Sequence, residues 1–453
     1  MDRAGVGRAP ARSWDTVSGM VRPNLKARGR TLVDVTADLD AIQADGFDAV
    51  EVFAPCAGGD CYSGLDTLDF FAIDPAIGTM ADFQRLVVEA HRRGMVVVAF
   101  LNLGYGHERF PAFLRACDDV HAGRETPDTR MFVWSQDGTT VMDRPLAPWF
   151  FNDAYGNWRW SDRAQSYFWV KWEGEHGGHH LPQFNWADPG WQTEARRIVE
   201  FWAATGIDGM VLDAVNWYIG ADWEIARRAM TEPLAAGMFS QPEGAGGFGD
   251  DPVPWIRDGG FTCIMDYSIK LWWEEKDLVR DAITAGDPSL IEDALRGYRD
   301  RVVGAGGVCY IDASPMPDAP LAPRLLAAAT VATVGELYLA IGDQAGTDES
   351  YRAGVRELLA ARRRYPALGA SGRRTRLEAS DDGVYAVLRE PTGDGEAVLV
   401  VLNFRPEPRA AAIDLGHRAG EAVDIRTGER HAFVGAVRVE LPPHGYAMLA
   451  LAD

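Results

Sequence analysis

Two carboxylates are placed where they could cleave a glycosidic bond. Asp213 ends the apolar run 209–212, and Glu243 follows the next short apolar run, residues 238–240. The 30 residues between the two acids match one strand–helix–strand step, which would put both at the carboxyl ends of neighbouring parallel strands. One acid could then attack or stabilise the anomeric carbon while the other protonates the leaving oxygen. Two plainer interpretations stay open: Asp213 as a structural acid at a strand end, and Pro242-Glu243-Gly244 as a simple turn.

Other polar or aromatic side chains end or follow further expected strands, and they form a set of candidate substrate ligands. In barrels of parallel strands, loops at the carboxyl ends carry the functional groups. The candidates are Asp66, Asn102, His107, Trp217 and Asp312. Asp312 is equally well explained as a solvated acid at the end of its strand.

The elements that must position these residues follow a helix-then-strand order. Residues 193–205 have an amphipathic helical pattern, and Gly206 is placed to end it because a left-handed conformation suits a residue without a Cβ. Residues 95–101 are apolar on both faces, as expected of a parallel strand covered by helices. The sequence predicts a (β/α)8 TIM barrel, which needs eight strands. We expect those strands at residues 49–53, 70–73, 95–101, 238–240, 261–265, 308–311 and 336–341, and in the run that ends at Asp213.

Two segments depart from this order. Residues 104–185 are rich in aromatic side chains and lack a strand–helix period, so we expect an inserted domain whose aromatics form its own core or a wall for sugar stacking. From about residue 373 the apolar period becomes two, which is typical of antiparallel strands. The expected domains are residues 1–103 (first part of the barrel), 104–185 (inserted domain B), 186–372 (second part of the barrel) and 373–453 (a C-terminal β-sandwich). Residues 1–30 show no pattern that predicts an element.

Composition excludes some classes of partner. A chain of 453 residues with a net charge of −21 is poorly suited to nucleic acid or to an anionic membrane, because both need clustered Lys and Arg. The first residues contain no apolar stretch typical of a signal peptide. The longest apolar segment, residues 321–341, is interrupted by Arg324 and Glu336. We therefore expect a cytoplasmic protein that binds neither nucleic acid nor membrane.

No metal site or cofactor is predicted. The five cysteines are scattered, and Cys56 and Cys61 lack the second pair that a zinc site needs. His176, His179 and His180 lie in a glycine-bounded stretch that could ligate a metal, but a flexible loop explains them better because no carboxylate or cysteine spacing accompanies them.

With these residues in view, the sequence resembles the α-amylase family of retaining glycosidases, glycoside hydrolase family 13. The resemblance runs from residue 31 through the C-terminal β domain and is nearest to the oligo-1,6-glucosidase and trehalose synthase type. It is carried by Ser63-Gly64-Leu65-Asp66, the segments 73–83 and 90–98, Leu181-Pro182-Gln183-Phe184-Asn185, the strand 208–213, and Gly342-Asp343-Gln344.

The resemblance implies roles for four residues. Asp213 would be the nucleophile and Glu243 the general acid and base. Asp66 would bind a sugar hydroxyl, and His107 would hold the ring on the non-reducing side. Trp217, just beyond the nucleophile, is a further candidate for the pocket.

Several positions depart from the family pattern. Val211 stands where the family has an arginine that orients the nucleophile, and Leu65 stands where it has a tyrosine that stacks under the ring. The family's first segment opens with aspartate and ends in asparagine-histidine, but here it reads Asn102-Leu103-Gly104-Tyr105-Gly106-His107. After Asp312, residues 313–315 replace the asparagine-histidine-aspartate that would supply a third acid. An ordinary starch or maltose hydrolase is therefore not expected.

We expect a glycosidase or transglycosidase of carbohydrate metabolism that acts on a small α-glycoside through a covalent intermediate, in a pocket rebuilt for another sugar. The alternative is a catalytically silent barrel that binds a carbohydrate or a protein partner. The sequence leaves the sugar, the linkage and the oligomeric state open.

Overall fold

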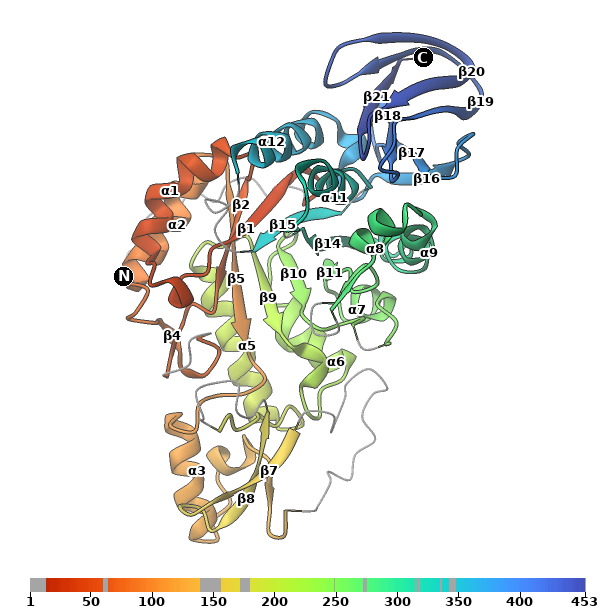
Figure 1. The fold of residues 1–453 in the computed structure, drawn as a ribbon. Coiled ribbons are helices and arrows are strands. Elements are labelled where there is room, and N and C mark those ends of the chain that lie inside the picture. The colour runs from red at the N-terminus through yellow and green to blue at the C-terminus, as the bar shows by residue number, and fades with distance from the viewer. Residues whose placement is uncertain are drawn as a thin grey trace. The chain divides into compact units, whose positions relative to one another are not determined.

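The computed structural model describes residues 14–59, 64–138, 156–171, 180–247, 249–271, 275–313, 316, 318–334, 336–341 and 348–452. Figure 1 shows the helices and strands of the chain. Its internal contacts divide the chain into two compact units. The first contains Pro23–Leu39 and Val50–Ile264, and the second contains Asp40–Ala49 and Met265–Asp453 together with the first strand.

The chain forms a (β/α)8 barrel with an inserted domain after its third strand and a C-terminal antiparallel β domain, as the sequence predicts. Every pairing that the structure describes between neighbouring barrel strands is parallel. The eight-stranded sheet has the order β10-β9-β5-β2-β1-β15-β14-β11. Its strands are β1 (Gly19–Arg22), β2 (Ala49–Phe53), β5 (Val96–Asn102), β9 (Gly209–Asp213), β10 (Phe239–Pro242), β11 (Cys263–Met265), β14 (Val308–Asp312) and β15 (Leu337–Ile341).

One predicted barrel strand was wrong and another was missed. Residues 70–73 belong to β4 (Thr67–Ile73), which pairs with β3 (Cys56–Gly58) in a separate two-stranded sheet. The first barrel strand is instead β1, only four residues long, which pairs with β15. Its start is held by Asp48, whose carboxylate accepts from the backbone N–H of Ser18 at 3.0 Å. A four-residue strand held by a tertiary contact leaves no period to detect in the sequence.

Side-chain caps mark the starts of two helices of the first unit, and α5 begins at Pro189, ahead of the pattern expected from residue 193. Thr79 and Asp82 form a reciprocal capping box at the start of α2, and the Asp188 carboxylate caps α5. Gly206, after α5, has φ of 96°, the conformation predicted for it. The barrel helices up to β11 are α1 (Leu32–Ala44), α2 (Met80–Arg92), α5 (Pro189–Ala204), α6 (Trp223–Ala226) and α7 (Val253–Arg257).

The insertion after β5 is a small helix-and-sheet assembly. It contains α3 (Pro111–His121), α4 (Pro127–Arg130) and a three-stranded sheet of β6 (Trp134–Ser135), β8 (Ser166–Lys171) and β7 (Gly156–Ser161). Phe113 packs at its centre, stacked on Trp134 and edge-on to Phe132. These aromatics therefore form the insertion's own core, one of the two roles expected for them.

The second unit adds helices and the C-terminal sheet. Its helices are α8 (Leu278–Ala285), α9 (Ser289–Gly297), α10 (Arg299–Gly304), α11 (Leu321–Val334) and α12 (Glu349–Arg364), and a short hairpin pairs β12 (Lys270–Leu271) with β13 (Lys276–Asp277). The C-terminal strands, blue in Figure 1, form one six-stranded antiparallel sheet in the order β16-β17-β18-β21-β19-β20. They are β16 (Arg373–Leu377), β17 (Val384–Glu390), β18 (Ala397–Asn403), β19 (Arg409–Asp424), β20 (Arg430–Leu441) and β21 (Tyr446–Ala452).

The C-terminal strands enclose a single apolar core that includes Leu399, Ile413 and Leu449. The pairing of β19 with β20 shifts register between Asp414 and Ala419, so the two long strands do not continue as one regular ladder. The domain boundaries given above, and the description of this domain as a sandwich, stay predictions.

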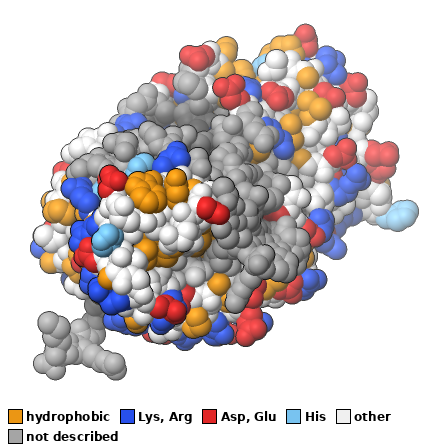
Figure 2. All heavy atoms as spheres, turned by 90° about the horizontal axis from the view of Figure 1, so that it is seen from below, with side chains coloured by type: hydrophobic (Ala, Val, Ile, Leu, Met, Phe, Trp, Pro, Cys, Tyr) orange, Lys and Arg blue, Asp and Glu red, His pale blue; other side chains and the backbone are white. Residues whose placement is uncertain are grey.

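The described surface mixes charges of both signs. On the face drawn in Figure 2, Lys and Arg side chains alternate with Asp and Glu rather than gathering by sign. No helix in the described part of the chain combines the length and the apolar character that crossing a bilayer needs.

Candidate active site

Strand register brings the backbones of Asp213 and Glu243 side by side. Pro242 of β10 lies opposite Leu212 of β9, and the next residue, Glu243, donates its N–H to the Leu212 carbonyl at 2.8 Å. The Glu243 carbonyl accepts in turn from Val215 N–H at 3.1 Å. The two acids therefore stand at the carboxyl ends of adjacent parallel strands in the first unit, as their spacing in the sequence predicts.

Asn102 is the register partner of Asp213 on the other neighbouring strand, β5. Opposed residues of a sheet share a face, and so do residues two apart along a strand. The layer next to Asp213 and Asn102 therefore contains Val211 and its partners Phe100 and Gln241. All three are buried and none carries a charge.

The side chain of Asn102 organises the loop that follows β5. Its amide donates to the carbonyls of Leu65 and Tyr105, both at 2.9 Å, and its oxygen accepts from Gly104 N–H at 2.8 Å. Both amide protons are thus used within the protein. The sequence marked Asn102 as a substrate ligand; these contacts favour a role in shaping the loop, and the direct contact with sugar stays a prediction.

Two buried tyrosines hold Asp213. The Tyr105 hydroxyl donates to Oδ2 of its carboxylate at 3.2 Å, and the Tyr218 hydroxyl donates to its backbone carbonyl. Burial first, and the negative charge of Asp213 next, raise the pKa of both phenols well above the usual value. Both hydroxyls therefore stay protonated and act as donors.

Tyr218 also ties two loops together. Its hydroxyl accepts from Leu103 N–H at 3.1 Å, and its ring stacks on Trp186 with centroids 4.9 Å apart. A Cβ on Gly104 would lie 2.7 Å from the Tyr218 ring, so this position accepts only glycine while the ring stays in place. The glycine in this segment is thus explained by a tyrosine 114 residues further along the chain.

Asp66 and His107 lie next to each other against Gly59, which follows β3. A Cβ on Gly59 would come within 2.6 Å of Asp66 Oδ2 and 2.8 Å of His107 Nε2. Both side chains are fully buried, and Arg109 N–H donates to His107 Nδ1 at 2.9 Å. The two side chains thus lie close together, and contact of either one with sugar stays a prediction.

Two further candidates occupy defined places. Trp217 is buried beyond the end of β9, and its backbone carbonyl accepts from the Gln183 side chain. Asp312 belongs to the second unit, where it ends β14 as predicted and lies 3.4 Å from Lys270 Nζ. That lysine also donates to the Asp312 backbone carbonyl at 3.2 Å, so Asp312 has an ion-pair partner within its own unit. Contact of either residue with substrate stays a prediction.

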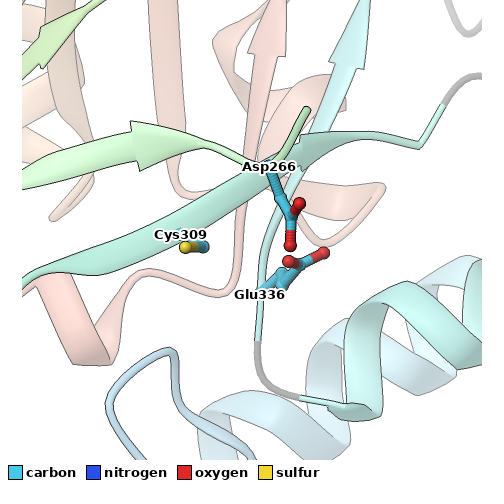
Figure 3. Close-up of side chains that lie close together, drawn as sticks. All are labelled: Asp266, Cys309 and Glu336. Atoms are coloured by element: carbon cyan, nitrogen blue, oxygen red, sulfur yellow. The ribbon is translucent and has the colours of Figure 1, made fainter. Parts of the chain in front are cut away.

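A cluster that the sequence did not suggest lies in the second unit. The cluster consists of Asp266, Cys309 and Glu336. One carboxyl oxygen from each acid and the Cys309 sulfur all lie within 4.8 Å of one another, and the two acids face each other in Figure 3. Burial first, and then Asp266, raise the pKa of Glu336 well above its usual value. A protonated Glu336 that donates to Asp266 accounts for this contact, so the cluster gives no reason to invoke a metal.

Buried arginines bind backbone carbonyls at the start of the C-terminal domain, and one of them, Arg299, also interacts with Glu336. Arg299 donates to the carbonyls of Ala370 and Gly372, both at 2.9 Å, and Arg389 donates to Gly372 at 3.0 Å. Burial first, and then neighbouring arginines, lower the pKa of Arg389. Chain carbonyls around residue 370 thus provide the acceptors that buried guanidinium groups need.

The histidine stretch offers little to test. His176 and His179 lie outside the described residues, while His180 donates its backbone N–H to the Glu108 carboxylate at 3.2 Å. Gly342-Asp343-Gln344, quoted above for the resemblance, also lies outside them.

Part of the sequence is similar to known carbohydrate-processing proteins. Residues 28–242 match the family described as Alpha amylase, catalytic domain. The trehalose-6-phosphate hydrolase of Escherichia coli (strain K12) is 28% identical over 182 residues, which are 40% of this chain and 31% of that protein. The trehalose synthase of Pimelobacter sp. (strain R48) is 30% identical over 157 residues, 34% of this chain and 25% of that protein. The matched stretch thus spans a third or less of either relative.

Solved structures agree on the fold. The α-amylase from H. orenii superposes with a TM-score of 0.74 at 16% identity, covering 96% of this chain and 100% of that one. At this identity the likeness supports the fold alone. The sequence match adds to this, because residues 28–242 include β2 to β10 and Asp213 and end one residue before Glu243. Over residues 28–242 the chain is thus similar to the catalytic domain of the α-amylase family.

Proposed function

We propose that this protein cleaves or transfers a small α-glucoside, with Asp213 as nucleophile and Glu243 as general acid and base. The observation that carries the proposal is the register that sets the two acids at the ends of β9 and β10. Because the similar proteins are named for trehalose and for trehalose 6-phosphate, these two sugars and aryl α-glucosides are the first substrates to test.

The proposed reaction has two displacement steps. In the first, an Asp213 oxygen attacks the anomeric carbon, the glycosidic C–O bond breaks, and Glu243 gives its proton to the departing oxygen. In the second, the Glu243 carboxylate takes a proton from water or from a sugar hydroxyl, and the oxygen of that acceptor displaces Asp213. Water gives hydrolysis; the released sugar, turned to present another hydroxyl, gives an isomer.

The surrounding residues support a pocket that differs from one built for starch. Val211 and Leu65 provide neither the cation nor the stacking ring that the family places there, whereas Asp66 and His107 remain together beside Gly59. We propose that Asp66 and His107 bind hydroxyls of the reacting ring, and that Trp217 lines the pocket.

The nucleophile is tested by turnover of the substrate panel by wild type and Asp213→Asn. Asp293→Asn is the matched control, since that side chain is 80% exposed on α9. We expect Asp213→Asn to lose activity by a factor of at least about 10⁴, as removal of a covalent nucleophile does, while the control keeps full activity. Full activity of Asp213→Asn would refute the proposal.

The acid is tested by the dependence on leaving group. Glu243→Gln should fail on trehalose but should still react with α-glucosyl fluoride, because fluoride leaves without protonation. Glu200→Gln on α5 serves as control, with a side chain 49% exposed. Equal losses on both substrates would assign Glu243 another role. Binding of sugars without turnover anywhere in the panel would favour the silent barrel.

A further inference from the structure

Tyr105 stands out among the groups around Asp213, because nothing in the proposed chemistry yet uses it. Its hydroxyl is 3.2 Å from Oδ2 of Asp213, and both residues are buried, with exposures of 3% for Tyr105 and 7% for Asp213. A hydrogen bond to a carboxylate out of water is among the stronger ones in a protein.

The backbone around Tyr105 is pinned from three sides. Tyr105 forms an isolated β-bridge with Gln183, and its carbonyl accepts from Asn102. Gly106 donates its N–H to Pro182 at 3.1 Å, and Phe184 donates to the Gly104 carbonyl at 2.9 Å. Because the loop is fixed at each of these points, the hydroxyl meets Asp213 without a further loss of conformational freedom.

The phenol is also held as a donor. Burial and the nearby charges of Asp213 and Glu243 disfavour its ionised form, so the proton lies on Tyr105 and points to the carboxylate. The layer next to Asp213, made of Phe100, Val211 and Gln241, carries no charge. The donor to the Asp213 carboxylate therefore lies in the loop after β5, not on β9, the strand that carries Asp213.

We infer that Tyr105 is the positioning residue of Asp213, a neutral hydrogen-bond donor that fixes the carboxylate for attack on the anomeric carbon. The inference rests on the proposed function. Removal of the hydroxyl leaves the ring and the loop in place but takes away one hydrogen bond that orients the carboxylate, so it slows attack with little change in substrate binding.

The test is Tyr105→Phe, with Tyr167→Phe on β8 as the matched control. We expect kcat to fall about 10- to 100-fold, the range for loss of one hydrogen bond to a charged group, with KM within about threefold of wild type. The acidic limb of the pH profile of kcat/KM should move to higher pH, because a carboxylate that loses a donor is protonated more easily. The other titratable groups that interact with this pair, Tyr218 and Glu243, are unchanged in the variant.

A second readout needs no activity. With 3-fluorotyrosine at position 105, the ¹⁹F resonance should shift in Asp213→Asn and stay in place in Asp293→Asn. An unshifted resonance, or a Tyr105→Phe variant with wild-type kcat and pH profile, would overturn the inference. If Asp213→Asn is inactive in that case, the proposed function survives; if Asp213→Asn is active, the function fails with it.

Discussion

Gly59→Ala tests the proposed sugar-binding pair without touching either member of it. The added Cβ would lie 2.4 Å from His107 Cδ2 and 2.6 Å from Asp66 Oδ2, distances that real contacts do not reach. The backbone has little room to yield, since Gly59 N–H donates to the Asp66 carbonyl at 3.1 Å and His107 N–H donates to Thr67 at 3.0 Å. The two side chains must therefore move by roughly 1 Å, the scale of displacement that costs about 10²-fold in rate at a catalytic site.

We expect kcat/KM of Gly59→Ala to fall about 100-fold on the best substrate of the panel. Both a higher KM and a lower kcat should contribute, and the loss should be seen with sugars that keep all their ring hydroxyls. Crowding of a packed site should lower the free energy of unfolding by about 1–3 kcal/mol, which urea denaturation measures. The assay is initial-rate kinetics at a temperature where both proteins are fully folded, so that the loss of activity is not a loss of folded enzyme.

Gly297→Ala is the control, because no atom lies within 4 Å of its added Cβ. It should match wild type in kcat/KM. A Gly59→Ala enzyme with kcat/KM within twofold of wild type would refute the placement of Asp66 and His107 at the reacting ring.

Three further substitutions probe the scaffold. Gly209→Ala would push a Cβ to 2.4 Å from Phe239 Cβ and 2.7 Å from its carbonyl oxygen, so the free energy of unfolding should fall by about 3 kcal/mol in urea denaturation. Asn102→Ala removes three hydrogen bonds of its loop and should lower Tm together with kcat, leaving residual activity well above that of a nucleophile variant. Glu336→Gln should change the pH dependence of stability. Because the pKa of Glu336 is raised, the folded wild type holds a proton that the unfolded chain releases above the usual glutamate range. The free energy of unfolding of wild type should therefore fall by up to about 1.4 kcal/mol per pH unit as the pH rises above that range, and the variant should lose this slope.

Gly209→Ala and Glu336→Gln each have a control with the same type of substitution. Gly297→Ala should leave the free energy of unfolding unchanged or slightly raised, and equal stability of Gly209→Ala would show that the strands can separate at that point. Glu200→Gln should keep the wild-type slope of stability against pH. A wild-type slope in Glu336→Gln would mean that this acid is already ionised in the folded protein. An Asn102→Ala enzyme with wild-type Tm and kcat would remove the loop role proposed for that amide.

Much of the barrel could be predicted from sequence because its signals are local. The all-apolar run that became β5 and the glycine that ends α5 need no distant partner to be recognised. β1 could not be found in this way, since its pairing with β15 and its anchor at Asp48 are tertiary contacts. The run at 70–73 is apolar enough for a barrel strand but pairs with β3, which only the fold decides.

The site residues likewise fall into those with a local sequence signal and those that only the fold reveals. Asp213 and Glu243 follow from strand ends and spacing, and the resemblance points to Asp66 and His107. Tyr105 and Tyr218 were missed, because neither has a motif of its own. The signal that could have found Tyr105 was the changed segment that begins at Asn102. Glycine stands there in place of the asparagine before His107, a tyrosine lies between two glycines, and Gly104 makes room for Tyr218.

The most direct test of the account is to trap the glycosyl-enzyme. Wild-type protein incubated with 5-fluoro-α-glucosyl fluoride, whose fluorine slows both steps, should gain the mass of one sugar. Peptide mass spectrometry should find that sugar on Asp213, and the Asp213→Asn variant should gain none. A label on any other residue, or turnover with inversion at the anomeric carbon and no trapped species, would contradict the assignment of Asp213 as nucleophile.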